Sequence, residues 1–295
     1  MLPNSWTLQE VVALSLSSRI TATEVRHLVE RYSSLGELLA NESGLAQRYR
    51  LDGSGLFSHR EHSPLLDRAK HQLDRCADLS VQIVHYWDDA YPSLLREIFY
   101  PPTLLYVHGR LQPPDAAAIA IVGTRHCTEY GKMVTEQYAE CFASAGIVVV
   151  SGLATGIDTY AHKATLKHGG ITYAVVASGV DKINTGAQYA LAQEIVTQGG
   201  AVLSEYPCGT SVQRAYFPRR NRIISGLACG TLVVESGERG GSLITAQFAL
   251  DQSRELFAVP GSILAPTSEG TNLLIAQQKA QAAVSPELLL AELGV

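Results

Sequence analysis

The feature that most constrains the fold is a regular alternation of short apolar runs and helical stretches between residues 119 and 259. Six runs rich in valine and isoleucine lie at Ile119–Val122, Ile147–Val150, Tyr173–Ala177, Ala201–Leu203, Thr231–Glu235 and Leu256–Val259. Stretches with helical spacing, such as Met133–Ala145 and Ala187–Thr197, separate most of them. Apolar strands that alternate with helices are typical of βαβ units, whose parallel sheet is covered on both faces. The sequence therefore predicts an α/β fold with a doubly wound, Rossmann-like parallel sheet.

The residues on either side of this alternating pattern are organised differently. Apolar residues recur at helical spacing between residues 25 and 39, and residues 64–78 predict another helix. We interpret residues 1–80 as a small helical N-terminal domain, either of the helix-hairpin-helix type or a simple packing appendage. Prolines punctuate residues 81–118, which predict a short strand at Val81–Val84 and a connecting segment that leads into the sheet domain. Residues 119–280 then form the Rossmann-like domain, and residues 281–295 form a C-terminal helical tail.

The net charge of −5 argues against nucleic acid as a partner only if the charge is spread evenly. Residues 1–118 carry 11 basic and 14 acidic residues, residues 119–265 carry 11 of each, and residues 266–295 carry 1 and 3. Within the neutral central part, the window from Arg214 to Arg222 contains four arginines and no acidic residue. The sequence therefore predicts a narrow basic site on a neutral or acidic body.

Glycine-rich segments follow the predicted strands at their carboxyl ends, where open α/β sheets bind ligands. They read Gly123-Thr124-Arg125 after the first strand, Ser151-Gly152 and on to Gly156 after the second, and Gly241-Ser242 after the fifth. Glycines let the backbone approach an anion, hydroxyls add donors, and an arginine suits phosphate. For any single loop the alternative is a tight turn that binds nothing. Neither the dinucleotide fingerprint nor the Walker pattern is present.

Asp158 and His162 are four residues apart and share a helical face. They are candidates for metal ligands or for an acid–base pair. The favoured interpretation is structural: Asp158 caps the helix that begins after Gly156, and His162 packs or bonds locally. The sequence contains no other convincing nucleophile, metal site or carboxylate pair, so we expect neither catalysis nor a cofactor.

The arginine window also contains Tyr216 and Phe217, so cations and aromatic rings are interleaved in it. Single-stranded nucleic acid needs both, because cations bind its backbone and rings stack on its bases. The alternative is a solvated helix start with Phe217 and Ile223 in the core. We favour binding, because no acid lies near these arginines in the sequence.

The five cysteines are widely spaced and include no C-x-x-C pair, which argues against a disulfide framework and a zinc site. Free thiols suit a reducing cytoplasm. The N-terminal ten residues lack the pattern of a signal peptide. The longest uncharged run, residues 141–157, is better explained by a strand and a loop than by a membrane span.

Several segments together resemble the DNA-processing protein A family (DprA, also called Smf). The most telling are AIVGTRHCTEYG (120–131), VVSGLATGIDTYAH (149–162), SEYP (204–207), FPRRNRIISGL (217–227), GGSLITA (240–246), FAVPG (257–261) and GTNLLI (270–275). YPSLLREI and PPTLLYVHG, around residues 91–109, match the region that precedes the sheet. The resemblance covers nearly the whole chain and is weakest in the first 80 residues.

This resemblance implies an extended Rossmann fold that binds single-stranded DNA without catalysis. It also implies a role in natural transformation and DNA recombination, loading of a RecA-type recombinase, and a homodimer formed through the Rossmann domain. The helical N-terminal module fits the family's sterile-alpha-motif-like domain. Arg125 and the Arg220–Arg222 segment are expected to contact DNA phosphate, with the Ser151-Gly152 loop completing the pocket. The expected DNA-binding residues are Gly123, Thr124, Arg125, Ser151, Gly152, Gly156, Phe217, Arg219, Arg220, Asn221, Arg222, Gly241 and Ser242.

Two departures from the family pattern stand out. The loop at 181–186 lacks the usual Tyr-Pro before its asparagine, and we expect no C-terminal winged-helix domain. The alternative function is a nucleotide hydrolase of the lysine-decarboxylase-like Rossmann group, but the glycines at 240–241 are not followed by the glutamate that such enzymes use. A third possibility is an interaction module with a vestigial pocket.

Overall fold

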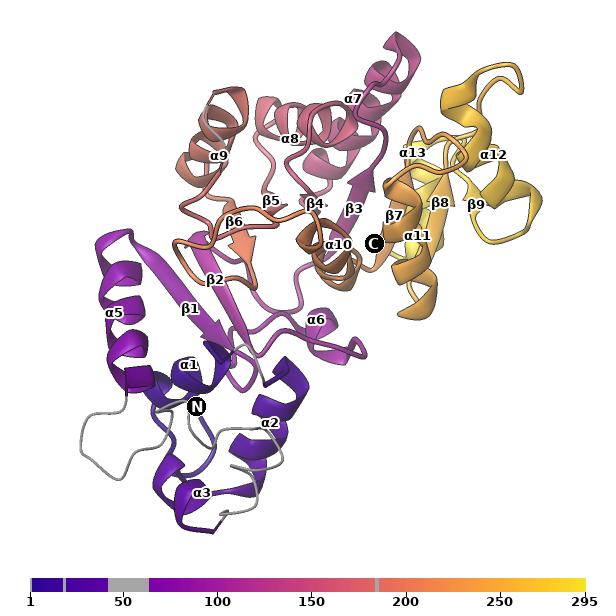
Figure 1. Cartoon of the computed structure of the whole chain (residues 1–295). Helices are drawn as coiled ribbons and strands as arrows, with labels where there is room; N and C mark the ends of the chain where they lie inside the picture. Colours follow the sequence, from indigo (N-terminus) through magenta and orange to yellow (C-terminus); the bar gives the residue numbers. More distant parts are fainter. Residues whose placement is uncertain (1, 18–19, 42–63, 184–185) are drawn as a thin grey trace.

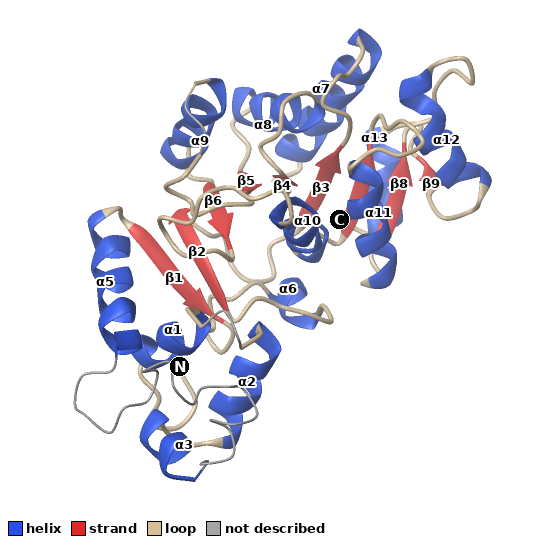
Figure 2. Ribbon diagram, viewed as in Figure 1, coloured by secondary structure: helices blue, strands red, loops and turns tan. Residues whose placement is uncertain are grey.

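The computed structural model describes residues 2–17, 20–41, 64–183 and 186–295, and its centre is one nine-stranded sheet (Figures 1 and 2). The strand order is β1-β2-β6-β5-β4-β3-β7-β8-β9. The strands are β1 (Val81–His85), β2 (Leu104–Gly109), β3 (Ala118–Val122), β4 (Val148–Ser151), β5 (Thr172–Val175), β6 (Ala201–Ser204), β7 (Gly230–Val233), β8 (Glu255–Ala258) and β9 (Gln281–Ala282). The six strands predicted from the apolar runs are all confirmed, as β3 to β8.

The order of winding reverses at β3, which pairs in parallel with β4 on one side and with β7 on the other. Ile119, for example, lies opposite Val149 of β4 and Gly230 of β7. The chain segments that follow β3 and β7 therefore diverge to opposite halves of the sheet, toward β4 and toward β8. The crevice at the carboxyl end of such a switch point is where doubly wound sheets bind their ligands.

The sequence predicts a parallel sheet, but two of the strand pairs are antiparallel. β1 pairs with β2, and β2 with β6, in antiparallel register. The segment 81–118 was expected to connect two domains, but it contributes these two strands to the same sheet. β2 was missed because its LLYVHG sequence follows two prolines and reads as a proline-punctuated extended stretch. The two-residue β9 lies in the predicted tail and pairs with β8. The proposed domain boundaries themselves stay a prediction.

Helices cover both faces of the sheet, as the doubly wound pattern requires. On one face, α7 (Glu129–Ser144), α8 (Ile157–Lys167) and α13 (Pro286–Leu293) pack on β3, β4, β7 and β8 through a shared apolar cluster. On the other face, α6 (Ser93–Glu97), α10 (Tyr216–Gly226) and α11 (Ser242–Asp251) pack on the opposite side chains of the same strands. Two more helices, α9 (Ala187–Thr197) and α12 (Glu269–Ala276), and the 3-10 turn Pro266–Ser268 complete this part of the chain.

The N-terminal residues form helices, as predicted, and they lie beside β1 at one end of the sheet (Figure 1). These are α1 (Leu8–Ser15), α2 (Ala22–Arg31), α3 (Leu35–Asn41) and α5 (Pro64–Asp78). Capping boxes start α1 at Thr7 and α2 at Thr21, each closed by a glutamate three residues on. One apolar cluster runs from these helices through Cys76 of α5 to Tyr106 of β2. Their core is therefore continuous with the edge of the sheet. No helix in the described ranges is both long and apolar enough to cross a membrane.

Candidate nucleic-acid interface

The loops after β3, β4 and β7 meet at the switch point, as their placement in the sequence predicted. The Thr124 amide donates to the Glu235 carbonyl across 2.8 Å, which joins the β3 and β7 loops. The Ile157 amide donates to the Thr124 carbonyl across 3.2 Å, which joins the start of α8 to the β3 loop. Three segments that are far apart in sequence thus form one surface at the carboxyl edge of the sheet.

Two glycines make this close approach possible. A Cβ on Gly123 would lie 2.5 Å from Cγ1 of Ile157, inside the α8 packing. Gly156 has a φ of +81°, and a Cβ there would lie 2.3 Å from the Thr124 carbonyl oxygen. Gly156 is therefore needed both for its left-handed backbone and for its lack of a side chain. These two glycines shape the loops by packing, whatever they bind.

The Ser151 hydroxyl does not face an open loop. Its Oγ donates to the Ile121 carbonyl across 2.6 Å, and the residue is fully buried. The prediction that Asp158 caps α8 is wrong, because the helix N-cap is Gly156 and it has no side-chain cap. The Asp158 carboxylate turns back instead, and its Oδ2 accepts from the amides of Gly152 (3.1 Å) and Ala154 (3.3 Å). Asp158 therefore fixes the backbone of the β4 loop.

Arg220 lies beneath this loop and is only 5% exposed. Its Nη1 donates to the carbonyl of Gly152 across 2.6 Å and to that of Val175. Burial lowers the pKa of Arg220 to about 10 and raises the pKa of Asp158, and each shift is opposed by the charge of the other residue. A Cβ on Gly152 would lie 2.3 Å from this Nη1. Arg220, which the sequence marked as a phosphate contact, thus uses Nη1 to hold the loop backbone.

Arg222 has an acidic partner that the sequence window did not contain. Its Nη1 and Nη2 donate to the two carboxylate oxygens of Glu205 across 2.8 and 2.7 Å. Its Nε donates to the Tyr100 carbonyl across 3.1 Å. The sequence suggested that no acid lies near these four arginines. For Arg222 this inference is wrong, because the fold brings Glu205 next to it. Glu205 follows β6, some 17 residues earlier in the chain.

The remaining arginines of the candidate site are exposed. Arg125 lies with its guanidinium 5.7 Å from the centre of the Phe217 ring, a cation–π contact between the β3 loop and the first turn of α10. Phe217 itself is half-buried, so its ring is neither wholly in the core nor free. Arg214 and Arg219 are also exposed, and within the described ranges no carboxylate pairs with them or with Arg125. Arg214 and Arg219 are thus the exposed arginines of the window, and Arg125 of the β3 loop lies beside it, against Phe217.

The start of α11 closes the site next to α10. The Asn221 Nδ2 donates to the Gly241 carbonyl at the long distance of 3.4 Å, and the Ser242 hydroxyl donates to the Ser236 hydroxyl across 3.0 Å. A Cβ on Gly241 would meet no described atom within 4 Å. Gly241 therefore faces open space, whereas Ser242 is buried.

His162, a residue of α8, packs locally, as expected, and is fully buried. The Thr172 hydroxyl donates to the Val149 carbonyl across 2.7 Å, so its oxygen accepts from Nδ1 of His162, also across 2.7 Å. The proton of the neutral ring is therefore on Nδ1, and Nε2 has no partner among the described residues. Burial lowers the pKa of His162 to about 3, and the Arg220 charge adds to this. The imidazole is neutral and structural.

Two residues at the site were not singled out from the sequence. Glu235 is 2% exposed, and its carboxylate accepts from the amide and hydroxyl of Thr128 (2.9 and 2.6 Å) and from the Thr267 hydroxyl (3.2 Å). Its signal was an acidic residue at the end of an otherwise apolar strand. Tyr206 stacks on Tyr216 with ring centres 4.0 Å apart and planes at 18°. No sequence signal links these two rings, because the loop between them sets their contact.

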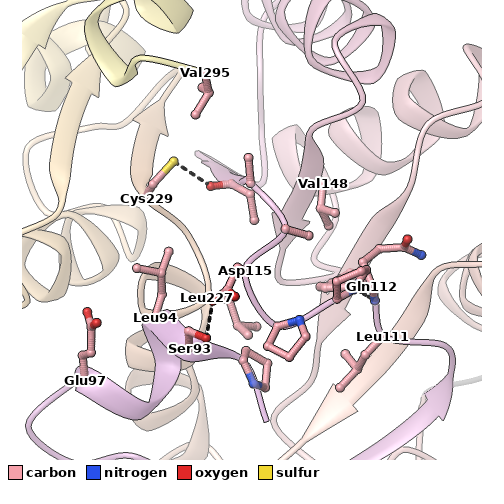
Figure 3. Close-up of a pocket in the computed structure, with 17 residues that line it drawn as sticks. Ser93, Leu94, Glu97, Leu111, Gln112, Asp115, Val148, Leu227, Cys229 and Val295 are labelled. Atoms are coloured by element: carbon pink, nitrogen blue, oxygen red, sulfur yellow. Dashed lines mark hydrogen bonds between the residues drawn. The ribbon is translucent and has the colours of Figure 1, made fainter. Parts of the chain in front are cut away.

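A cavity of about 360 Å³ lies away from these loops, at the opposite edge of the sheet (Figure 3). Ala118 and Val148, which begin β3 and β4, line it, together with the hydrogen-bonded pair Ser93 and Asp115 (2.5 Å). None of the expected DNA-binding residues lines this cavity. The described residues also contain no group of three or more side chains that could hold a metal ion. Asn184 and Thr185 of the atypical 181–186 loop lie outside the described residues.

Residues 82–294 match the sequence profile of the family described as DNA recombination-mediator protein A. The chain belongs to this family. It is 44% identical over 202 residues to protein Smf of Escherichia coli K12, a match that covers 68% of this chain and 54% of Smf. The chain therefore spans about half the length of that relative. The matched range begins within β1, so both antiparallel strands, β1 and β2, fall in it.

Two solved structures of the family are similar to this fold. The X-ray structure of DNA processing protein A from Streptococcus pneumoniae superposes with a TM-score of 0.77 at 34% identity, covering 97% of this chain and 98% of that one. DNA processing protein A from Helicobacter pylori, whose structure addresses its single-stranded DNA binding mode, gives a TM-score of 0.65 at 28% identity, covering 73% and 96%. The extended Rossmann-like fold expected from the resemblance is confirmed.

Proposed function

We propose that this chain binds single-stranded DNA, without catalysis, at the loops that meet beside β3. The observation that carries the proposal is the contact between Arg125 and Phe217, which brings an exposed cation and a partly exposed ring together at the switch point. A strand that crosses this point would set a phosphate against Arg125 and a base against Phe217. The structural relative from Helicobacter pylori, studied for its single-stranded DNA binding, supports the same ligand.

The cations available to the strand are few. Arg125, Arg214 and Arg219 are exposed, whereas Arg222 is neutralised by Glu205. We propose that Arg220 acts from beneath, because its guanidinium holds the Gly152 carbonyl and places a positive charge under the loop. The site then binds a short stretch of backbone, and repeated sites along one strand would raise the overall affinity.

The decisive experiment compares oligo-dT with a duplex of equal length by fluorescence anisotropy, with Arg125→Ala and Arg68→Ala beside the unmodified chain. Arg68 is an exposed arginine of α5, which lies at the far end of the sheet from β7 and β8 (Figure 1). We expect preference for the single strand, about a tenfold loss with Arg125→Ala, and no change with Arg68→Ala. Equal losses in both variants would show that the binding is not located at these loops.

The alternative of a nucleotide hydrolase needs an acidic side chain that can reach a substrate. Three acids lie at the loops: Asp158 and Glu235 are buried, and Glu238, between β7 and α11, is exposed. Asp158 is engaged by loop amides, and Glu235 by Thr128 and Thr267. No observation at the site favours hydrolysis. Release of free base from a panel of nucleoside monophosphates would revive this alternative.

We also propose that the chain helps to load a RecA-type recombinase onto the bound strand, in the cytoplasm, during DNA uptake and recombination. Membership of the recombination-mediator family supports this role. The test is recombinase filament formation on DNA already covered by single-stranded-DNA-binding protein. Stimulation by the unmodified chain but not by Arg125→Ala supports loading at this site. If the unmodified chain binds DNA but does not stimulate filament formation, the loading role is rejected and the DNA-binding role is not.

A homodimer through the sheet domain is the last part of the proposal. Ile263 and Leu264, in the loop after β8, are each 88% exposed, which is unusual for two adjacent large apolar side chains. We propose that a second copy covers them. Light scattering should give twice the chain mass, and the monomer mass for a double Ile263→Asp, Leu264→Asp variant. A monomeric unmodified chain at micromolar concentration would reject the dimer.

A further inference from the structure

Cys76 and Cys208 come from distant parts of the chain and meet in the interior. Their sulfur atoms lie 3.7 Å apart, although 132 positions separate the two residues. Cys76 is on α5, and Cys208 is in the loop that joins β6 to α10. Both residues are buried, at 3% and 6% exposure. The binding site proposed above makes no use of either thiol.

Polar contacts on both sides of the sulfurs hold α5 against this loop. With its amide oriented so that both polar atoms are satisfied, Gln72 accepts from the Cys208 amide (2.7 Å) and donates to the Cys208 carbonyl (3.2 Å). Arg75 pairs with Asp181 across 2.6 Å, and the other oxygen of Asp181 accepts from the Gly209 amide across 2.7 Å. These contacts fix the backbone of α5 and the backbone of the loop on either side of the two thiols. The folded chain therefore already holds the two sulfur atoms next to each other.

The two thiols are not equivalent. The pKa of Cys76 lies below its ordinary value, mainly because the Cys208 thiol hydrogen-bonds to its sulfur, with a smaller contribution from the Arg75 charge. The pKa of Cys208 is raised correspondingly. A thiolate is the nucleophile in thiol oxidation. With Cys76 as the thiolate that reacts first, Cys208 lies 3.7 Å away, in position to resolve it.

We propose that Cys76 and Cys208 are a disulfide-forming pair that hydrogen peroxide oxidises, linking α5 to the loop between β6 and α10. The Cys76 thiolate attacks one peroxide oxygen, the O–O bond breaks, and the hydroxide that leaves takes up a proton to become water. Cys208 then attacks the sulfur of the Cys76 sulfenic acid, forms the S–S bond and expels the second oxygen as water. Two thiols lose two electrons, and one peroxide is reduced to two waters. Peroxide is small enough to reach a thiol that is nearly buried.

The loop that this bond would restrain carries two contacts of the candidate site. Glu205 holds Arg222, and Tyr206 stacks on Tyr216. A bond across such a long stretch of chain restricts the unfolded state strongly. The oxidised protein should therefore resist heat better than the reduced one, and the loop should open less often. This proposal is independent of whether the chain binds DNA.

The test uses the full, reduced chain, treated with a small excess of hydrogen peroxide and then digested without reduction. We expect mass spectrometry to find the Cys76 and Cys208 peptides joined. We also expect the midpoint of thermal unfolding to rise by roughly 5 °C and amide exchange in 205–210 to slow. Cys141→Ser, which removes a partly exposed thiol on α7, is the matched control and should behave like the unmodified chain.

Two results would overturn the proposal. One is that both thiols stay open to alkylation after peroxide treatment and unfolding. The other is that Cys76 ends as sulfinic acid or pairs with a cysteine other than Cys208. Cys208→Ser separates the steps, because it should leave Cys76 as a trapped sulfenic acid that a dimedone probe labels. Since the main measurement is made on the unmodified chain, it does not depend on whether this variant folds.

Discussion

Glu205 grips Arg222 with both carboxylate oxygens, at 2.8 and 2.7 Å, and so joins the end of β6 to the second turn of α10. The two side chains are only 17% and 13% exposed, so water screens the pair weakly. The same arginine fastens the Tyr100 carbonyl. The sequence suggested that Arg222 contacts nucleic acid. In the structure it links α10 to the loop after β6 and to the segment that contains Tyr100.

Glu205→Gln should therefore destabilise the fold. It removes the charge that balances a mostly buried guanidinium, and we expect a loss of about 2 kcal/mol in the free energy of unfolding. Glu97→Gln is the matched control, because the Glu97–Arg254 pair has a carboxylate that is 63% exposed. It should cost less than about 1 kcal/mol. Urea unfolding of both variants checks the difference, and equal costs would contradict the structural role of Glu205.

A methyl group at Gly152 should be far more damaging than one at Gly241. The Cβ of Gly152→Ala would lie 2.3 Å from the Arg220 Nη1 and 2.7 Å from the Asp158 Oδ2, and neither group can move without losing buried hydrogen bonds. We expect a loss of about 3 kcal/mol. Gly241→Ala meets nothing within 4 Å and should stay within about 0.5 kcal/mol of the parent. Similar unfolding midpoints for the two variants would refute this account of the loop.

His162 should make the fold sensitive to acid. Its pKa is about 3 in the folded chain and near 6.5 when unfolded, so the unfolded state binds the proton more readily. The stability that this group provides is complete above pH 6.5 and is lost as the pH falls toward 3, by about 1.4 kcal/mol per pH unit. His162→Gln removes the titration. Urea unfolding at pH 7 and pH 5 should show a smaller loss in the variant by roughly 2 kcal/mol. An identical pH dependence in both proteins would be inconsistent with a buried neutral imidazole.

Charge and stacking at the proposed DNA site should be separable by salt. Arg219→Ala should weaken oligo-dT binding and flatten the log–log salt dependence by about 0.7, the value for one phosphate on a single strand. Phe217→Leu should weaken binding by about 1–3 kcal/mol with an unchanged salt slope, because stacking releases no counterions. Binding titrations between 50 and 300 mM salt distinguish the two. A Phe217→Leu variant with full affinity would place the ring in the packing rather than on the DNA.

The repeating pattern was sufficient to predict the α/β class, the six strands β3 to β8 and the meeting of their loops. Each of these depends on local periodicity and on the common direction of parallel strands. β2 and β9 were not predicted, because their formation depends on pairing with other strands and not on a local pattern. β2 follows two prolines, and β9 is two residues long, so each becomes a strand only because an existing sheet edge pairs with it.

At the site, the sequence by itself determined which residue types gather at the switch point. It placed glycines, hydroxyls and arginines at strand ends, and the family resemblance predicted single-stranded DNA as their ligand. Only the tertiary structure decided what each one does. Arg220 is buried under the Gly152 loop, Arg222 is held by Glu205, and Arg125 is left exposed beside Phe217. Charge balance and burial are set by neighbours in space, and those neighbours come from strands far apart in the chain.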